Sequence, residues 1–483
     1  MFLITKTLKK SKDSGKNVEN LKKIIDSSIK KDRLNKIFLN DISSTIDLPR
    51  KVVEKKSKQI ILKEFNYNKF KFQNTNNILI NFFSNLKILF YFFSLLLCIH
   101  FFNFKKKKIY TSILIEDLHG ERALNIYNKI IKKNKKTFLL LPNFFVSKYK
   151  LCPYKYVKLI PYKKDIFKNK KIVSLIFKYF FISLKYKQNF LKILFPIIYS
   201  YAKNFSKYSY INSNYLLHSR IYLSCPIRNY LYKKLGGKKI ITIQSHIIEN
   251  TISLYSDMDH LLTFGKSGET KKKLIKLGGR IDKIQPVGSL RMEYELDFKR
   301  TLTKKKIDIL ILGVNPTKWM DTSNDIKKNY YVFLDWIVKI AKLYPQLSIT
   351  YKHHWSFQGD SIEDKILLNS NIKRIIKDKN NLSSYDYLNE GNLVLSFCST
   401  MILEAQAINK PAFFIDPNNS STTFFSYLPS LKELRINKFK MLEQNVKKFV
   451  LKKNYNYKIK DKNLICLKSK NVSNKILNYL KKK

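Results

Sequence analysis

The stretch Leu393–Pro417, LVLSFCSTMILEAQAINKPAFFIDP, constrains the fold more than any other part of the chain. Leu393–Phe397 is a short apolar run, which is typical of a strand buried on both faces of a sheet. A helix is expected after Ser399 and Thr400, and Ala412–Ile415 forms a second apolar strand. A strand, a helix and another strand in such close succession predict an α/β protein with a parallel sheet.

The turn between this strand and its helix has the composition of an anion site. The hydroxyls of Ser399 and Thr400 are expected to accept hydrogen bonds from the first N–H groups of the helix. The remaining N–H groups and the helix dipole favour a phosphate there. Glu404 lies one turn beyond Thr400, whereas the acid of a capping box would fall at position 402 or 403. Two interpretations of Glu404 stay open: a solvated helix residue and a ligand of the bound group.

Polar residues also follow strands in the first half of the chain. The apolar strand Ile109–Ile115 precedes a loop, a helix and the strand Thr137–Leu141, and the loop begins with Glu116, Asp117 and His119. The strand Lys239–Gln244 is followed by Ser245 and His246. In open α/β sheets, ligands bind at the carboxyl ends of the strands. These residues are therefore candidates for a site.

The α/β pattern restarts after the charged segment Arg291–Lys306, which we interpret as an inter-domain linker. The strand Ile307–Leu312 leads into a turn that contains Asn315, and a later strand ends in His353 and His354. Alternation along a strand places these two imidazoles on opposite faces, so at most one of them is expected to contact a given ligand.

These patterns predict two Rossmann-like domains that face each other across a cleft. The predicted parts are a lysine-rich helical extension (1–108), an N-terminal Rossmann-like domain (109–290), a C-terminal Rossmann-like domain (306–430) and closing helices (431–483). Segment 148–238 is expected to be mostly helical.

The formal net charge of +58 comes mainly from lysines spread over the whole chain. Arginines, which suit bidentate contacts to phosphates and bases, are few, and no nucleic-acid-binding motif is present, so we expect no specific nucleic-acid partner. An anionic membrane surface suits this charge better.

Two aromatic stretches, 78–104 and 172–201, support a membrane partner. The uncharged core of the first, Ile88–Phe102, has about 15 residues, fewer than the roughly 20 that span a bilayer. We expect a helix on the cytoplasmic face of the plasma membrane, held by Lys105–Lys108. The alternative for both stretches is a core helix covered by other elements. The first residues lack the apolar region of a signal peptide, and five scattered cysteines fit a reducing compartment.

Absent motifs narrow the chemistry. The sequence has no G-x-G-x-x-G, Walker or G-x-S-x-G motif and no metal-binding spacing. An anion site in one domain with acids and imidazoles in the other suits metal-independent transfer of a group from a nucleotide-activated donor to a hydroxyl. No cofactor is expected besides the donor substrate.

Two segments resemble bacterial surface-polysaccharide glycosyltransferases of the two-domain GT-B type. Segment 241–291 is similar to their inter-domain half, with a polar strand end, a Tyr, an Asp, a Gly after a strand and then V-G-S. Segment 397–416 is similar to their S-T…E-A…G-K-P…D pattern, which here reads Ser399-Thr400, Glu404-Ala405, Asn409-Lys410-Pro411 and Asp416.

Other residues are similar to motifs of GT-B sialyltransferases and polysialyltransferases: Glu116-Asp117…His119-Gly120, the His353 region and Ser399-Thr400. The resemblance implies that the carboxylate of the acidic motif acts as the catalytic base. It also implies that the histidine of the His353 region contacts the CMP part of the donor and that Ser399 and Thr400 contact its phosphate. This chain departs from those motifs in inserting Leu118-His119 before Gly120, in having His354 in place of Pro, and in having Ser245-His246 in place of His-Gly. The departures bear on the donor more than on the fold.

We therefore predict an inverting glycosyltransferase of surface-polysaccharide synthesis that moves a sugar, with a CMP-sugar as one candidate donor, to a glycan or lipid-linked acceptor. Asp117 is the first candidate for the base and His246 the second, with Glu116 and His119 beside them. The predicted donor site comprises Asn315, His353 or His354, Ser399, Thr400 and, on the ribose, Glu404. One alternative is a CDP-glycerol-type glycerophosphotransferase, which would depend most on His246. Another is a non-catalytic basic protein that binds membranes or nucleic acid on a GT-B scaffold.

Overall fold

The computed structural model describes most of the chain, with gaps. The described residues are 18–66, 82–83, 85–93, 108–116, 126–141, 156–158, 169–186, 190–219, 224–246, 254–266, 269–297, 307–315, 324–354, 357, 359, 361–368, 370–376, 383–419, 429–454, 465–467 and 470–481.

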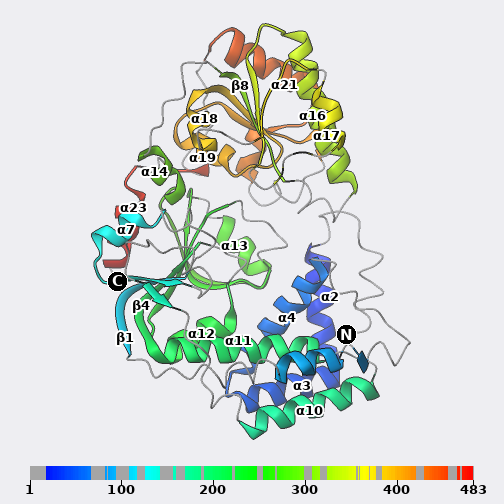
Figure 1. Ribbon diagram of the computed structural model, residues 1–483, viewed down its shortest axis with the longest axis vertical. Helices are drawn as coiled ribbons and strands as arrows, with labels where there is room; N and C mark the ends of the chain where they lie inside the picture. The colour runs from blue at the N-terminus through cyan, green and yellow to red at the C-terminus, as the bar shows by residue number, and fades with distance from the viewer. Residues whose placement is uncertain are drawn as a thin grey trace.

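In this described part, seven parallel strands form the first sheet, in the order β3-β2-β1-β4-β5-β6-β7 (Figure 1). They are β1 (Ile109–Ile115), β2 (Thr137–Leu141), β3 (Tyr156–Lys158), β4 (Ile211–His218), β5 (Lys239–Ile243), β6 (Asp257–Thr263) and β7 (Arg280–Pro286). The register places Ile115 beside Leu217 and Ile241 beside His260.

The second sheet has six parallel strands among the described residues, in the order β10-β9-β8-β11-β12-β13. They are β8 (Ile307–Leu312), β9 (Ile349–Lys352), β10 (Lys373–Ile375), β11 (Gly391–Ser396), β12 (Ala412–Ile415) and β13 (Arg435–Ile436). Both sheets thus have the doubly wound order 3-2-1-4-5-6, which the first extends by one strand. Two Rossmann-like domains, as predicted, are confirmed.

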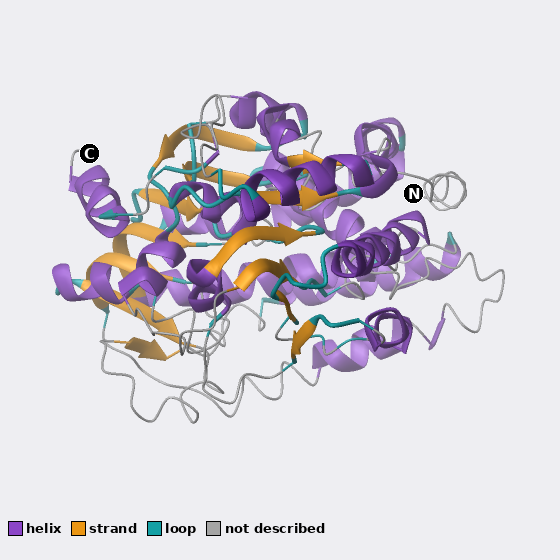
Figure 2. Cartoon of the chain, turned by 90° about the horizontal axis from the view of Figure 1, so that it is seen from above, coloured by secondary structure: helices purple, strands orange, loops and turns teal. Residues whose placement is uncertain are grey.

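Helices connect and cover these strands. They are α2 (Val18–Lys31), α3 (Arg33–Thr45), α4 (Arg50–Asn66), α7 (Asn128–Lys133), α10 (Lys170–Lys185), α11 (Leu191–Tyr210), α12 (Pro226–Lys234), α13 (Glu269–Lys276), α14 (Leu290–Asp297), α16 (Asn324–Leu343), α17 (Ser361–Leu368), α18 (Ser384–Glu390), α19 (Met401–Ala407), α21 (Phe439–Val446), α23 (Val472–Lys481) and the short helices η3 (Pro417–Asn419), η4 (Pro429–Leu434) and η5 (Lys447–Leu451). Figure 2 shows the strands from above with helices flanking them.

Alternate residues of each strand lie in different cores. In the first sheet, Ile113 and Ile115 pack with α7 and α23, whereas Leu114 packs on the other face with Tyr208 of α11. In the second sheet, Ile309 packs beneath α16, and Leu310 packs beneath α18 and α19. Burial on both faces explains why these strands are continuous apolar runs in the sequence.

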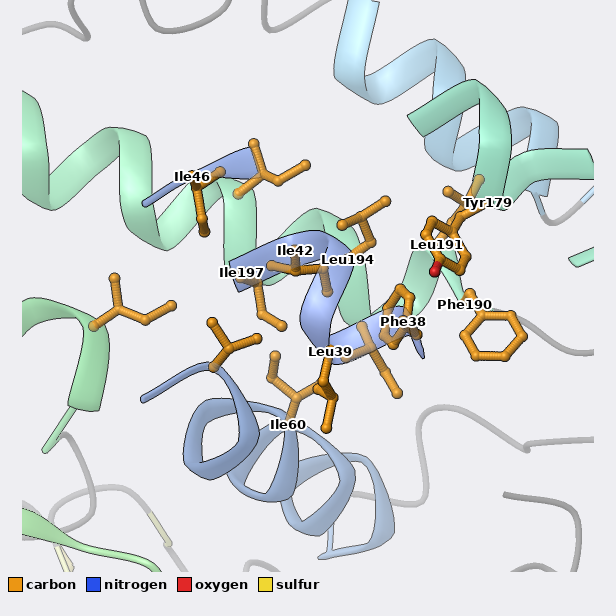
Figure 3. Close-up of a cluster of buried hydrophobic side chains, with 14 of the residues drawn as sticks. Phe38, Leu39, Ile42, Ile46, Ile60, Tyr179, Phe190, Leu191, Leu194 and Ile197 are labelled. Carbon is orange, nitrogen blue, oxygen red and sulfur yellow. The ribbon is translucent and has the colours of Figure 1, made fainter. Parts of the chain in front are cut away.

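The N-terminal helices form a core with α10, α11 and α12 and are not a peripheral extension. Ile25, Ile42 and Val53 are fully buried in this core, and Phe38 packs edge-on against Tyr179 of α10 (Figure 3). The helical region predicted for this part of the chain is present. In this lysine-rich region, the apolar residues at helical spacing are the ones that pack in the core.

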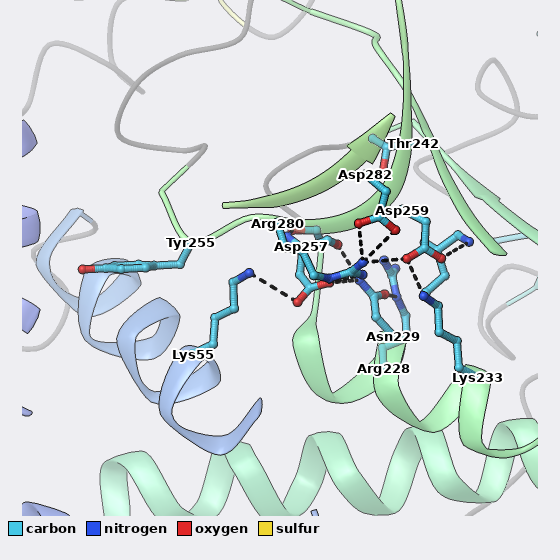
Figure 4. A network of polar contacts seen from close by, with 12 residues as sticks. Lys55, Arg228, Asn229, Lys233, Thr242, Tyr255, Asp257, Asp259, Arg280 and Asp282 are labelled. Atoms are coloured by element: carbon cyan, nitrogen blue, oxygen red, sulfur yellow. Dashed lines mark hydrogen bonds and ion pairs between the residues drawn. The ribbon is translucent and has the colours of Figure 1, made fainter. Parts of the chain in front are cut away.

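A network of ion pairs ties these helices to the first sheet (Figure 4). Lys55 of α4 lies 3.3 Å from Asp257, the first residue of β6, and Arg280 of β7 donates to Asp257 and Asp259 at 2.7 and 2.8 Å. Burial would raise the pKa of Asp259, but hydrogen bonds from Lys233 and the N–H of Ile240, together with the charge of Arg280, lower it. Asp257 is the first residue of β6, so its ion pairs with Lys55 and Arg280 lie at the amino end of that strand.

The described residues of segment 148–238 are mostly helical, as predicted, and also contain strands β3 and β4. The predicted closing helices are interrupted by β13 in 431–451. The first residues of the proposed linker belong to α14, which is packed against both domains. Met292 is buried in the core of the second domain, and Glu293 accepts a hydrogen bond from the backbone N–H of Ser473 at 2.8 Å. Within the described residues, no helix is long and apolar enough to cross a bilayer.

Candidate active site

Of the predicted site residues, Glu116, Asn315, Ser399 and Thr400 lie at the switch points of the two sheets. In a doubly wound sheet, the crevice that binds a ligand opens where the strand order reverses, outside the carboxyl ends of the two central strands. In the first sheet these strands are β1 and β4, which end beside Glu116 and at His218. In the second they are β8 and β11, which are followed by Asn315 and by Ser399-Thr400.

Glu116 is held as a permanent anion. Its carboxylate accepts hydrogen bonds from Nζ of Lys207 and, at 2.8 Å, from the hydroxyl of Tyr208, and Nη1 of Arg228 lies 3.9 Å away. Burial would raise the pKa of Glu116, but the charges of Lys207 and Arg228 and the two hydrogen bonds outweigh it and lower the pKa to about 2. A carboxylate this acidic is suited to orienting and stabilising charge rather than to taking a proton at neutral pH.

His218, which the sequence analysis did not single out, joins this cluster. Nη2 of Arg228 lies 3.0 Å from Nε2 of His218, and the hydroxyl of Thr242 lies 2.9 Å from the same nitrogen. Arginine can only donate, so Nε2 accepts and the ring proton is assigned to Nδ1. The last residue of β4 is thereby linked through Arg228 to Glu116 at the end of β1.

His246 has a defined tautomer at the next strand end. Oγ of Ser245 donates to the carbonyl of Ser219 at 2.5 Å and lies 2.8 Å from Nδ1 of His246. The hydroxyl of Ser245 already donates its hydrogen to this carbonyl, so it can only accept from Nδ1 of His246. The ring hydrogen is therefore assigned to Nδ1, and Nε2 is the basic nitrogen. His246 is half-buried. An oriented imidazole at a strand end has the geometry of a general base.

Asp117 and His119 lie outside the described residues. Their predicted roles therefore stay predictions. Glu116, which precedes Asp117 directly, lies at the carboxyl end of β1.

The Ser399-Thr400 turn is fixed to the neighbouring strand by a serine. Oγ of Ser396 donates to the carbonyl of Leu312 at 2.7 Å and accepts from the N–H of Ser399 at 3.1 Å. Oγ of Ser399 accepts from the N–H of Met401 at 3.3 Å, as predicted for a hydroxyl at the helix start. The same expectation for Thr400 was wrong, because its backbone is already helical and its side chain makes no capping hydrogen bond.

Glu404 is buried between the two domains, so its interpretation as a solvated residue was wrong. One carboxylate oxygen accepts from the hydroxyl of Ser289, which follows β7, and the other accepts from the hydroxyl of Tyr385 at 2.6 Å. Burial raises the pKa of Glu404, and these two hydrogen bonds and the charge of Arg291 only partly offset the effect. Through Ser289, the carboxyl end of the first sheet meets the start of α19 in the second domain.

The two histidines after β9 differ in their surroundings. His353 is buried, with Nδ1 3.2 Å from Oε1 of Glu363 and Nε2 accepting from Nε of Arg374 at 3.4 Å. Desolvation lowers the pKa of His353 to about 4, and the charge of Arg374 adds to the effect. His354 is half-buried, as is Asn315. Both ring nitrogens of His353 thus face protein groups.

No group of three or more His, Cys, Asp or Glu side chains in the described part of the chain is placed to hold a metal ion. A small apolar hollow lies between segment 85–93, α10 and α11. Only apolar side chains line it, including Leu89, Ile176 and Leu194, so it offers nothing to a nucleotide.

Sequence reasoning missed three residues of the first cluster, Lys207, His218 and Arg228. The apolar run before His218 was the available signal, since it marks a strand that ends in an imidazole. Lys207 and Arg228 gave no signal among so many other cations, because only the fold shows that they are buried.

No protein-family model matches the chain, and no curated protein matches it in sequence. Solved structures do resemble it in fold. A UDP-N-acetylglucosamine 2-epimerase from Listeria monocytogenes has a TM-score of 0.48 at 10% identity, with 77% of this chain and 96% of that chain covered. The wall teichoic acid polymerase TagF has a TM-score of 0.44 at 10% identity, with coverage of 85% and 98%. A UDP-GlcNAc 2-epimerase from Neisseria meningitidis has a TM-score of 0.43 at 12% identity, with coverage of 77% and 100%. The fold assignment rests on the strand orders given above and not on these likenesses.

Proposed function

We propose that the protein is a metal-independent glycosyltransferase of the GT-B type, which transfers a sugar from a nucleotide-activated donor to a hydroxyl of a surface glycan or lipid-linked acceptor. The observation that carries the proposal is the placement of complementary groups at the two switch points. Glu116 and His218 lie at the ends of the central strands of the first sheet, and the hydroxyl and amide groups of Ser399, Thr400 and Asn315 follow those of the second. Ligands of doubly wound sheets bind at such points.

The proposed reaction needs one base and one anion site. The acceptor hydroxyl oxygen attacks the anomeric carbon of the donor sugar, and the bond from that carbon to the donor phosphate breaks. The nucleotide leaves with the bonding electron pair, and the base takes the hydroxyl proton. Asp117 remains the first candidate base, with Nε2 of His246 as the second. Ser399 and Thr400 would receive the phosphate, beside Asn315 and His354. His353 would support this wall, since its nitrogens face Glu363 and Arg374.

The orientation of His246 supports a second candidate function: a glycerophosphotransferase that uses a CDP-glycerol-type donor. There the acceptor oxygen attacks phosphorus, the nucleotide leaves as CMP, and a neutral imidazole such as His246 takes the proton. Activity assays of His246→Gln and Asp117→Asn separate the two candidates. We expect the larger loss from Asp117→Asn if the enzyme transfers a sugar and from His246→Gln if it transfers glycerol phosphate.

A thermal-shift screen with CMP, CDP, UMP, UDP and GDP tests the donor site directly. A ligand present at 100 times its dissociation constant stabilises by about 2.7 kcal/mol, which shifts the melting temperature by a few degrees. A shift with UDP or GDP would indicate a hexose donor. A shift with CMP fits a CMP-sugar and also the CMP released from a glycerol-type donor, so the His246 and Asp117 variants decide between these two; a shift with CDP favours the glycerol-type donor.

The double variant Ser399→Ala/Thr400→Ala locates the response. It should abolish the nucleotide shift, whereas the matched variant Ser44→Ala/Thr45→Ala at the end of α3 should retain it. If none of the five nucleotides raises the melting temperature of the wild type, the proposal is contradicted.

A further inference from the structure

The helical region presents an outward aromatic surface that the proposed sugar transfer does not use. Phe83, Phe90 and Phe181 are 63%, 71% and 64% exposed. Isolated exposed apolar residues are ordinary, but clustered ones mark a site of interaction.

These side chains form two helical stripes that meet. Phe83, Leu86, Phe90 and Phe93 are all exposed, at helical spacings of three and four residues along segment 82–93. Phe177 and Phe181 are exposed one turn apart on α10, and the rings of Phe93 and Phe177 lie 6.2 Å apart. We call these six residues the aromatic face.

The opposite sides of the same helices already have a protein partner. Leu89 and Phe92 are buried in the helical core, as are Ile176 and Phe180 of α10. A helix that is apolar on its inner and its outer side needs a second apolar environment for the outer side.

Cations surround the aromatic face. Lys87, Lys170, Lys171 and Lys185 are exposed on the two helices, and neither sequence 82–93 nor 169–186 contains an acidic residue. The Nζ atoms of Lys87 and Lys185 lie 5.9 and 5.7 Å from the ring centroids of Tyr91 and Tyr186. Exposed aromatic rings flanked by lysines are the arrangement by which interfacial helices enter the headgroup region of anionic lipids.

We propose that the aromatic face binds an anionic bilayer surface, with its phenylalanines in the interface and its lysines at the headgroups. A second copy of the chain fits less well, because pairing two such faces would bring like charges together. Single-stranded nucleic acid also stacks on aromatic rings, but the phenylalanines here are flanked by Leu86 and lack the arginines typical of such platforms. The inference concerns a surface outside the candidate active site, so its failure would leave the proposed function untouched.

Vesicle co-sedimentation of the full-length protein tests the proposal. We expect binding to phosphatidylcholine vesicles with 30% phosphatidylglycerol and little binding to pure phosphatidylcholine. Phe83→Ser/Phe90→Ser/Phe181→Ser should weaken binding at least about tenfold. The control Tyr110→Ser/Ile275→Ser/Leu368→Ser, made at exposed positions outside the aromatic face, should bind as wild type. Lys87→Gln/Lys185→Gln should weaken binding and reduce its salt dependence.

Circular dichroism and the nucleotide thermal shift show whether the triple variant is folded. If it is not, Phe90→Ser, at the most exposed of the six positions, takes its place. No binding of the wild type to anionic vesicles would overturn the proposal. Equal binding by the face variant and the control variant would also overturn it. So would a wild-type dimer that dissociates in the face variant. The same holds if the face variant loses binding to a single-stranded oligonucleotide but still binds vesicles as wild type.

Discussion

Buried charges at the carboxyl end of the first sheet are held by specific partners. Lys207 has no exposed surface, yet its ammonium contacts Glu116 beside Tyr208 and Arg228. Removing one member of such a pair leaves an uncompensated charge in the interior, which costs far more than the intact pair contributes.

We therefore expect Lys207→Met to destabilise the protein by about 3–5 kcal/mol, measured by urea denaturation. Lys203→Met, one turn away on the same helix, should cost little because Lys203 is half-buried. The double variant Lys207→Met/Glu116→Gln should regain part of the loss. A loss from Lys207→Met no larger than that from Lys203→Met would contradict this account.

The low pKa of His353 predicts a pH dependence of stability. The folded protein titrates this group at about 4 and the unfolded chain near 6.5, so the unfolded state binds more protons between these values. His353 therefore contributes its full stability above 6.5 and loses it as the pH falls toward 4. Denaturation midpoints measured across this window should fall more steeply for wild type than for His353→Gln, and parallel curves would contradict the assignment.

At the scale of elements, strands were predicted better than the residues that join the domains. Continuous apolar runs such as Ile307–Leu312 and Ala412–Ile415 were located at their observed bounds, because burial on both faces leaves a strong local signal. β4 was missed because polar residues interrupt its first half, INSN. The role of Glu404 could not be predicted, since its partners Ser289 and Tyr385 meet it only after both domains have folded.

The contact between α18 and α19 supports a prediction of its own. Tyr385→Phe removes one donor to the buried carboxylate of Glu404, and an unsatisfied buried acceptor costs about 1–3 kcal/mol. We expect a loss of that size in urea denaturation. Tyr110→Phe, at a largely exposed position on β1, is the control and should be neutral. Equal effects of the two changes would show that Glu404 finds another donor.

At the scale of the whole molecule, the chain returns to its first domain after completing the second. α23 packs on α7 and α14, with Val472 and Ile476 fully buried beside strands of the first sheet. Ser473 donates two hydrogen bonds to Glu293, and Tyr479 contacts His260 at 3.0 Å. The helix itself was predicted from the sequence. Where it packs was not, because its partners are distant in the sequence: Ser473 and Glu293 are 180 positions apart.

Ile476→Ala tests that return. Truncating a fully buried isoleucine costs about 2–5 kcal/mol, so the first domain should unfold at a lower denaturant concentration. Asn478→Ala, on the exposed side of the same helix, should change little. If both variants unfold like wild type, α23 does not stabilise the first domain.

The return of α23 also has a consequence for synthesis on the ribosome. The second domain is an insertion within the first, because the core beside β1 receives Val472 and Ile476 only after every strand of the second sheet has been translated. Domains generally fold as units during synthesis. Here the first domain is completed only by α23, so the nascent chain must carry an open apolar surface until that helix emerges.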